Sequence, residues 1–240
     1  MAIERLQKIL SSCGFGSRRD CEKLIADGIV TVNNIPAKLG DSGDLLKDDI
    51  CVNGEKISKS HSKNTYIILN KPANILSEIK DDRKRRTVID LINHDGYLFI
   101  VGRLDYQSEG LILLTDDGDI ANKLTHPRFE HEKEYQVLVS RHPTKDQYYR
   151  WEHGLRLPDG NKTLPTKVVK ISTTSEGTWL KVILREGKKR QIREIGKVIG
   201  LPVKRIIRTR IGPISLEDME PGQWRYLDRT EIAILKKSCT

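Results

Sequence analysis

A single carboxylate stands in a polar loop between two apolar stretches of the sequence. Residues 99–101 are apolar, the loop 102–110 carries Asp105, and the apolar run 111–114 follows. A polar loop between two strands is a common way to hold a reactive side chain at the edge of a rigid sheet. Asp105 is therefore a candidate for carboxylate chemistry, although a lone aspartate after a strand is more often a turn former or a helix cap.

Positive charge is concentrated in one stretch near the carboxyl-terminal end. Between Lys181 and Arg210 the sequence has 11 basic and 2 acidic residues. The net charge of this stretch, +9, equals that of the whole chain. Most charge runs are solvated helix faces, but here Val, Ile and Leu interrupt the run at core-like spacing. The pattern favours a basic surface fixed on a folded domain, with nucleic acid as the expected partner.

The composition narrows the class of protein further. The chain has 240 residues, of which 37% are hydrophobic and 31% charged, which is typical of a folded protein with one medium domain and a small one. The four cysteines form no C-x-x-C pair and have no histidine at ligand spacing, so we expect neither a metal site nor a disulfide framework. We find no apolar run of membrane-spanning length and no signal peptide, and we expect a cytoplasmic protein.

The pattern of the first 34 residues predicts two short helices followed by a strand. Apolar residues have helical spacing up to Cys13, and glycines at 14 and 16 end that helix. Ser17 followed by Asp20 predicts a capping box and a second helix from Arg18. A strand over 29–32 and an Asn33-Asn34 turn complete the pattern. The helix start carries Arg18 and Arg19, where phosphate is the natural ligand, although these residues alone slightly favour ordinary surface charge.

This stretch resembles the S-four-type RNA-binding domain, from about residue 3 to residue 55. The SRR at the second helix and the GIVTVNN strand carry the resemblance. The resemblance implies binding of RNA and does not determine the chemistry, because the module occurs in unrelated proteins. The residues that it implicates are Lys8, Ser17, Arg18, Arg19 and Lys23.

Four later segments resemble the Rsu family of ribosomal RNA pseudouridine synthases. GRLDYQSEGLILLTDDG, at 102–118, resembles the family's signature loop, and the segment from His126-Pro127 to Tyr135 resembles its second motif. EGKKRQIR, at 186–193, resembles the third motif, and KRIIRTRIGPISL, at 204–216, the closing strand region. Two positions depart from the family pattern. Asn74 stands where glycine is expected, although asparagine tolerates a left-handed backbone, and Glu194 replaces a second basic residue.

The resemblance implies roles for individual residues. Asp105 would be the nucleophile, Arg193 would pair with it, and Tyr135 would stack on the target base. The target uridine must first be flipped out of its stack, and Arg103 would fill the vacated space, although a structural salt bridge is an equal alternative. Ile183 is a candidate for an apolar wall of the uracil pocket, and Lys188 and Arg190 are candidates for binding the substrate. The isomerisation imports no group and oxidises nothing, so no cofactor or metal is expected.

The predicted fold is α+β. A small RNA-binding module at 1–56 and a linker at 57–64 precede a catalytic domain at 65–240, which has a mixed, mainly antiparallel sheet flanked by helices. Within that domain we expect helices at 87–93, 119–124 and 191–199.

The expected substrate is ribosomal RNA, from the large subunit, either free or in a pre-ribosomal particle, and the expected protein is a monomer that binds neither DNA nor membranes. The alternatives left open are small-subunit ribosomal RNA or transfer RNA as substrate, and a non-catalytic RNA-binding protein of ribosome assembly.

Overall fold

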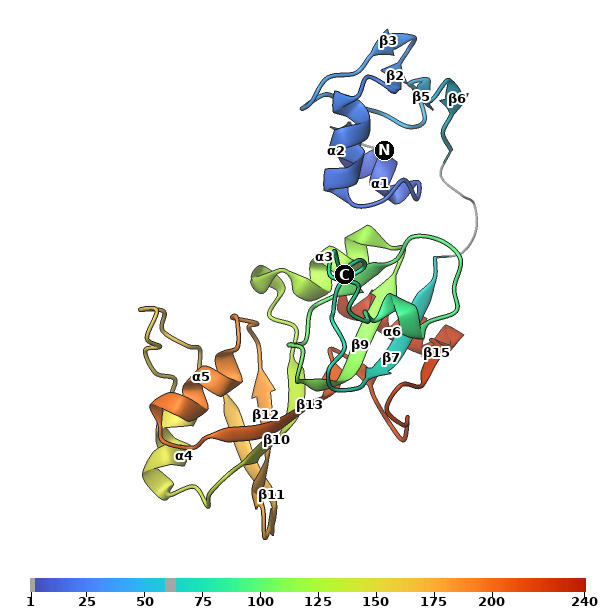
Figure 1. The fold of residues 1–240 in the computed structure, drawn as a ribbon. Helices are drawn as coiled ribbons and strands as arrows, with labels where there is room; N and C mark the ends of the chain where they lie inside the picture. The colour runs from blue at the N-terminus through green and yellow to red at the C-terminus, as the bar shows by residue number, and fades with distance from the viewer. Residues whose placement is uncertain (1–2, 59–63) are drawn as a thin grey trace. The chain divides into compact units, whose positions relative to one another are not determined.

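The computed structural model describes residues 3–58 and 64–240 and divides into two compact units (Figure 1). The smaller unit comprises residues up to Thr65 together with His94–Phe99 and Asp116–Gly118. The larger unit comprises Tyr66–Asn93, Ile100–Thr115 and Asp119–Thr240. Of the linker predicted at 57–64, residues 59–63 lie outside the described residues.

The smaller unit is built on two helices and short strands. Its elements are β1 (Glu4–Arg5), α1 (Leu6–Ser12), α2 (Arg18–Ala26), β2 (Val30–Val32), β3 (Ile35–Pro36), β4 (Ser42–Gly43), β5 (Ile50–Val52) and β6 (Glu55–Lys56). The order of its four-stranded sheet is β3-β2-β5-β6, and β1 pairs with β4. The buried core contains Leu6, Leu10, Cys21, Val30 and Ile50, which come from both helices and two strands.

The local signals of this unit are confirmed. The Ser17 hydroxyl accepts a hydrogen bond from the Asp20 N–H, and the Asp20 carboxylate accepts one from the Ser17 N–H, which is the predicted capping box. Asn33 and Asn34 have φ of 52° and 65°, so they form the left-handed turn that joins β2 to β3. Neighbouring residues favour both features, which is why the sequence predicted them, and Asn33 also bonds Asp48 and Asp49.

The larger unit is a mixed sheet of nine strands with helices packed against it (Figure 1). Its strands are β7 (Tyr66–Lys71), β8 (Phe99–Val101), β9 (Glu109–Thr115), β10 (Lys133–Val139), β11 (Lys167–Thr174), β12 (Gly177–Leu184), β13 (Val203–Ile211), β14 (Ile214–Ser215) and β15 (Trp224–Tyr226). The main order is β11-β12-β10-β13-β9-β7-β15, with β14 on β13 and β8 on β9. The predicted mixed, mainly antiparallel sheet is confirmed, and the pair β9–β13 is parallel.

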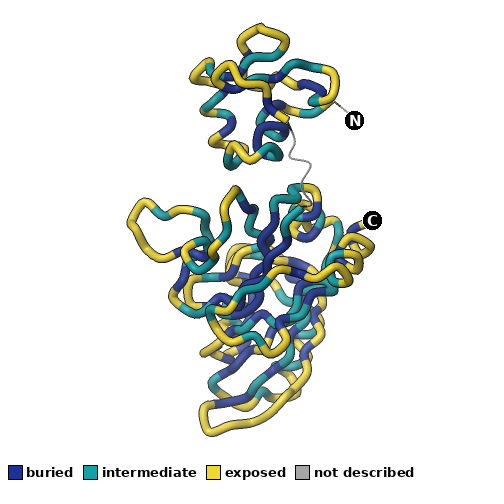
Figure 2. The backbone as a smooth tube through the Cα atoms, turned by 90° about the vertical axis from the view of Figure 1, so that its right-hand side faces the viewer, coloured by how far each residue is buried: buried dark blue, intermediate teal, exposed yellow. Residues whose placement is uncertain are grey.

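Four helices complete this unit. They are α3 (Gly118–Thr125), α4 (Lys145–Glu152), α5 (Gln191–Val198) and α6 (Arg229–Ser238). Leu124 of α3 and Leu235 of α6 join Ile68, Leu111 and Leu113 in one buried cluster, so these helices cover one face of β7 and β9. Figure 2 shows the central strands as mainly buried, whereas many of the connecting loops are exposed. Within the described residues, no helix combines the length and the apolar character needed to cross a membrane.

One predicted helix is wrong. The segment 87–93 forms only a short 3₁₀ turn at Ile89–Leu91, whereas the helices expected at 119–124 and 191–199 are present as α3 and α5. The Asp90 carboxylate accepts hydrogen bonds from the N–H and the hydroxyl of Thr87, at 2.7 and 3.1 Å, and Thr87 also bridges to Leu76. The turn goes no further because the chain is extended at Ile92, with φ of −114° and ψ of 127°, so the helix that the apolar spacing suggested does not form.

The two halves of the large sheet meet where β9 passes β13. The parallel pairing there is short, with Glu109 opposite Ile207 and Gly110 opposite Arg208. Gly110 has φ of +103°, and a Cβ at this position would lie 2.3 Å from the carbonyl oxygen of Arg208. Glycine is required because both the backbone conformation and the close approach exclude a side chain.

The loop that carries Asp105 is held by polar groups from the end of β7 and from the segment that follows it. Lys71 is completely buried, and its ammonium donates hydrogen bonds to the carbonyls of Pro72 (2.9 Å), Ile75 (2.8 Å) and Tyr106 (3.3 Å). The buried Ser77 hydroxyl accepts from the N–H of Leu104 and donates to its carbonyl. Asn74, with φ of +63°, donates its N–H to Tyr106 at 2.8 Å. The left-handed backbone expected at Asn74 is thus confirmed.

We expect Gly110→Ala to lower the free energy of unfolding by about 3 kcal/mol or more, because a methyl group would strain the backbone and separate β9 from β13. Gly187→Ala is the matched control, since its Cβ would meet no atom within 4 Å, and it should change stability by less than about 1 kcal/mol. The measurement is urea unfolding followed by circular dichroism. If both variants lost the same free energy of unfolding, the close contact between Gly110 and Arg208 would be contradicted.

Lys71 gives a second prediction, for pH dependence. Burial lowers the pKa of its ammonium to about 8, while the charges of Glu109 and Asp105 oppose the shift. Between about pH 8 and the ordinary lysine pKa of 10.5, the unfolded chain binds more protons than the folded one, so stability from this group rises with pH. Relative to Lys71→Met, the wild type should gain about 2 kcal/mol of unfolding free energy between about pH 7.5 and 10. Parallel pH profiles of the two proteins would refute this.

Candidate active site

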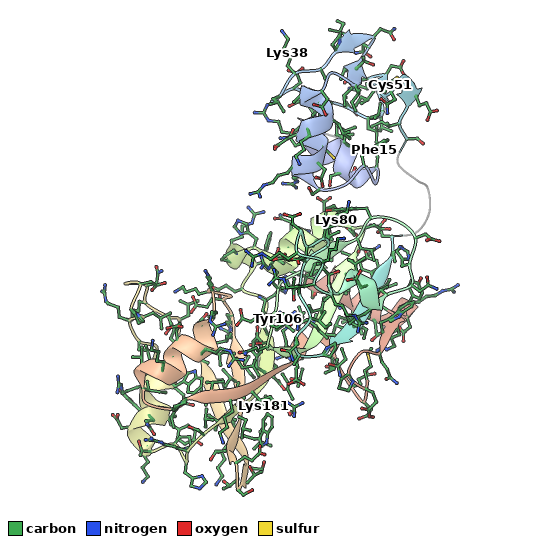
Figure 3. All side chains as sticks on the ribbon, in the orientation of Figure 1. Phe15, Lys38, Cys51, Lys80, Tyr106 and Lys181 are labelled. Atoms are coloured by element: carbon green, nitrogen blue, oxygen red, sulfur yellow. The ribbon has the colours of Figure 1, made fainter. Side chains whose placement is uncertain are left out.

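Asp105 lies in the loop between β8 and β9. Tyr106, the next residue of this loop, is labelled in Figure 3. The Asp105 carbonyl accepts the Ser108 N–H at 2.9 Å, which closes a turn, and the Asp105 side chain is about one-third exposed. Asp105 borders a cavity of about 100 Å³ and a larger open depression of about 900 Å³. The smaller cavity is also lined by Arg103, Leu104, Ser108, Tyr135, Leu184, Gly187, Lys188, Arg190, Gln191, Ile192 and Ile206.

Arg190 makes the ion pair with Asp105, with 3.8 Å between Nη1 and Oδ2. It stands immediately before α5 with φ of +53°. The segment before it is folded by the buried Glu186 carboxylate, which accepts from the Gln191 amide at 2.6 Å and from the Leu164 N–H at 2.8 Å. Gln191 in turn accepts the Lys188 N–H at 3.2 Å. These bonds fix the turn that points Arg190 toward Asp105.

Arg193 was predicted to pair with Asp105, and the structure differs at this point. One turn into α5, its guanidinium donates to the Val203 carbonyl at 3.2 Å, and its Nε has no hydrogen-bond partner among the described residues. Burial lowers the pKa of Arg193, the charge of Arg190 lowers it further, and the charge of Asp105 raises it. The charge of Asp105 therefore still acts on Arg193. The direct ion pair with Asp105 is made by Arg190, which stands in the left-handed turn before α5.

Tyr135 lies on β10, opposite Val182 of β12 and Arg208 of β13, and is 8% exposed. It lines the same small cavity as Asp105, as predicted for a ring that contacts a base. The Arg208 side chain is completely buried next to it and donates to the carbonyls of Leu111 (2.8 Å) and Arg103 (3.5 Å). Burial lowers the pKa of Arg208, whereas the neighbouring Tyr135 raises it.

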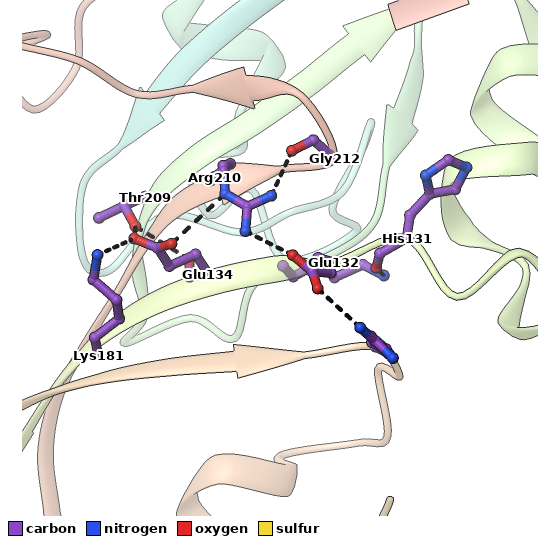
Figure 4. A network of polar contacts seen from close by, with 9 residues as sticks. His131, Glu132, Glu134, Lys181, Thr209, Arg210 and Gly212 are labelled. Atoms are coloured by element: carbon purple, nitrogen blue, oxygen red, sulfur yellow. Dashed lines mark hydrogen bonds and ion pairs between the residues drawn. The ribbon is translucent and has the colours of Figure 1, made fainter. Parts of the chain in front are cut away.

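A polar network fixes the strand that carries Tyr135 (Figure 4). Arg210 of β13 donates to Glu132 at 3.0 Å and to the Gly212 carbonyl at 2.7 Å, and its Nε lies 3.6 Å from Glu134. Lys181 of β12 pairs with Glu134 from the other side, at 3.4 Å. Ion pairs on both sides of β10 therefore set its register against both neighbours.

On β12, Leu184 and not Ile183 contributes to the apolar wall of the cavity. Successive side chains of a strand point to opposite faces, and on β12 the buried positions are Leu180, Val182 and Leu184. Ile183 falls between them on the other face and does not line the cavity. The predicted residue was displaced by one position because a run of apolar residues does not reveal which face is buried.

Two of the predicted substrate-binding residues, Arg103 and Lys188, lie at the rim of the cavities that Asp105 borders. Arg103 lines both cavities and is largely exposed, and its guanidinium pairs with Glu78 at 3.0 Å. Lys188 also lines both, and its ammonium pairs with Glu186 at 3.0 Å and donates to the Lys162 carbonyl. Arg103 thus has the salt bridge considered in the sequence analysis, in an exposed position where such pairs are weak.

In the smaller unit, the predicted RNA-binding residues fall into two groups. Arg18, Arg19 and Lys23 are exposed on α2. Lys8 pairs with Glu4 at 2.5 Å, and the Ser17 hydroxyl is engaged with Asp20 in the capping box. Ser17 therefore acts through helix capping, which positions Arg18 and Arg19.

Sequence reasoning missed Lys71, Ser77, Glu186 and Arg208 as residues that position the site. Each is polar and almost fully buried. A lysine before Pro72 and several basic residues in the strand that carries Arg208 were visible in the sequence, but nothing indicated what Lys71 and Arg208 would contact. The assembled site combines one carboxylate, two nearby guanidinium groups, an aromatic ring and an aliphatic wall. Such a site can bind a planar polar ring and present a carboxylate to it.

Comparison with known proteins agrees with this geometry. The family model described as RNA pseudouridylate synthase matches residues 65–195, and the model of the S4 domain matches residues 4–41. Ribosomal large subunit pseudouridine synthase B of Bacillus subtilis is 35% identical over 238 residues, which cover 98% of this chain and 96% of that protein.

Dual-specificity RNA pseudouridine synthase RluF of Escherichia coli is 37% identical over 238 residues, covering 97% of this chain and 78% of that protein. A crystal structure of a pseudouridylate synthase superposes with a TM-score of 0.69 at 26% identity, covering 96% of this chain and 99% of that one. The predicted family and fold are confirmed. The chain therefore belongs to the RNA pseudouridylate synthase family and carries an S4 domain at its amino-terminal end.

Proposed function

We propose that this enzyme isomerises one uridine of large-subunit ribosomal RNA to pseudouridine, with Asp105 as its nucleophile. The observation that carries the assignment is the small cavity where Asp105, Arg190 and Tyr135 meet. The specificity for large-subunit RNA is supported by the name of the Bacillus subtilis relative, which the chain matches over nearly its whole length.

The reaction breaks the bond between the ribose and a ring nitrogen, turns the uracil, and rejoins it through a ring carbon, which then gives up its proton while the released nitrogen gains one. The base must leave its stack, at a cost of a few kcal/mol that is smaller for a loop nucleotide. Arg103 is suited to occupy the vacated space because it is exposed at the rim, and its weak pair with Glu78 must break when it does so. Asp105 then attacks as the ionised carboxylate.

Once inside, the uracil is held between Tyr135 and the wall formed by Leu184 and Ile206. Arg190 is half-exposed and can turn to an RNA phosphate, whereas Arg193 is withdrawn and has a buried Nε without a hydrogen-bond partner in the described part of the chain. When RNA draws Arg190 away, Arg193 replaces it beside Asp105. In this proposal Asp105 pairs with Arg190 before RNA binds, as observed, and with Arg193 afterwards, as predicted.

The amino-terminal module, at 1–56, delivers the RNA to the catalytic domain at 65–240 through the linker at 57–64. Arg18, Arg19 and Lys23 contact phosphates from the exposed side of α2, and Lys8 joins them when its exposed pair with Glu4 opens. The protein acts in the cytoplasm as a monomer and does not use DNA as a substrate.

We expect Asp105→Asn to abolish the modification, because the amide cannot act as an anionic nucleophile. Pseudouridine is mapped with a base-specific chemical probe in ribosomal RNA from cells with the wild-type chain, no chain or the variant. One position should lose its pseudouridine in both of the last two strains. Asp146→Asn, an exposed aspartate on α4, is the control and should restore it.

Other outcomes of that experiment are informative. If Asp105→Asn restores the modification, the nucleophile is another group. If no ribosomal position changes in any strain, the substrate is not ribosomal RNA, and purified protein should then be tested on transfer RNA. Binding of ribosomal RNA without any modification would indicate a role in ribosome assembly instead.

The two arginines should have separable effects. Arg193→Gln should lower kcat by about 100-fold with little change in KM, because it removes the cation that faces Asp105 during the reaction. Arg190→Gln should mainly raise KM and reduce the salt dependence of RNA binding, because it removes a phosphate contact. Steady-state kinetics on a ribosomal RNA transcript distinguish the two. A larger fall in kcat for Arg190→Gln would assign the catalytic pair to Arg190.

A further inference from the structure

A second cavity, of about 130 Å³, adjoins the one that contains Asp105. The two cavities share Arg103, Tyr135 and Gly187 in their linings. The rest of its lining is formed by Gly102, Thr125, His126, Pro127, His131, Lys133, Arg185, Glu186 and Arg208. Nothing in the proposed reaction uses this space.

The lining of this cavity is strongly basic. Lys133, Arg103, Arg185 and Arg208 contribute cations, and Glu186 is the acidic residue of the lining. The carboxylate of Glu186 is already engaged elsewhere, since one oxygen accepts from Gln191 and Leu164 and the other pairs with Lys188. Arg185 pairs with Glu132 at 3.3 Å.

Lys133 and Arg208 are the unusual members of this set. The Lys133 ammonium donates to the His131 carbonyl at 3.3 Å, and Arg208 donates to main-chain carbonyls, so neither has a carboxylate partner among residues 3–58 and 64–240. Arg208 is 1% exposed, and its Nη2 forms no hydrogen bond with any described residue. Burial lowers the pKa of Lys133, and the charge of Arg208 lowers it further.

Two like charges in such surroundings are costly unless an anion balances them. Arg208 has a donor without an acceptor among the described residues and repels the neighbouring Lys133, so this pair of cations lacks an anion there. An anion in the cavity would accept from Nη2 of Arg208 and from the Lys133 ammonium, and would relieve the repulsion between them. The cavity is large enough for a phosphate group.

We propose that this cavity binds a phosphodiester of the RNA strand next to the flipped uridine. The inference rests on the proposed function and names a subsite of the same site. A flipped nucleotide remains joined to its neighbours by phosphates, and Tyr135 and Arg103 line both the uracil cavity and this one. A backbone phosphate would thus enter beside the base and hold its ribose over Asp105.

The test is the salt dependence of binding to a ribosomal RNA transcript. Lys133→Gln should reduce the slope of log affinity against log salt by about 0.7–0.9, which corresponds to one phosphate contact. Lys133→Arg should keep the wild-type slope because it keeps the charge, and circular dichroism verifies that each variant folds. Lys170→Gln, at an exposed position on β11, is the matched control and should leave the slope unchanged.

A wild-type slope in Lys133→Gln would overturn the proposal. In that event, thermal stabilisation of the wild type by inorganic phosphate, lost in Lys133→Gln, would assign the cavity to a free anion instead. Pseudouridine formation by the wild type on the same transcript is measured in parallel. Failure of that assay refutes the proposed function, whereas an unchanged slope with normal activity refutes only the phosphate subsite.

Discussion

The close passage of β9 against β13 is the constraint on which the rest of the larger unit depends. Gly110 and Arg208 meet there with no room for a side chain on Gly110, and this contact joins the two groups of antiparallel strands. Asp105 precedes β9, whereas Tyr135 lies on β10, which pairs with β13. The carboxylate and the ring therefore share one cavity because these two backbones touch.

Buried polar groups then fix what the sheet brings together. Lys71 and Ser77 hold the Asp105 loop through main-chain carbonyls, and Glu186 folds the turn that presents Arg190. Each of these side chains is almost completely buried, so its hydrogen bonds are made in surroundings where losing them is costly. The site is thus positioned by side chains that themselves take no part in the chemistry. Lys133 and Arg208 likewise donate to main-chain carbonyls, but these two cations line one cavity together.

The sequence reasoning failed where spacing or motif position alone did not reveal which contacts a residue makes. The segment 87–93 has helical spacing, but Leu76 donates to the Arg86 carbonyl and accepts from the Val88 N–H, the chain is extended at Ile92, and only a 3₁₀ turn forms. The ion pair with Asp105 that the resemblance assigned to Arg193 is made in this structure by Arg190, which stands in a left-handed position before α5, and the role of Arg193 in the reaction stays a prediction. Leu184 replaces Ile183 because the buried face of β12 is set by its neighbours.

The sequence by itself determined what depends on neighbouring residues and on long motifs. It predicted the capping box at Ser17, the asparagine turn at 33–34, the left-handed Asn74, the mixed sheet and the family. Only the tertiary structure decided which cation faces Asp105, which side chain forms the apolar wall, and that Lys133 and Arg208 share a cavity. Those results depend on strand pairing and backbone approach between residues far apart in the chain, which local spacing does not encode.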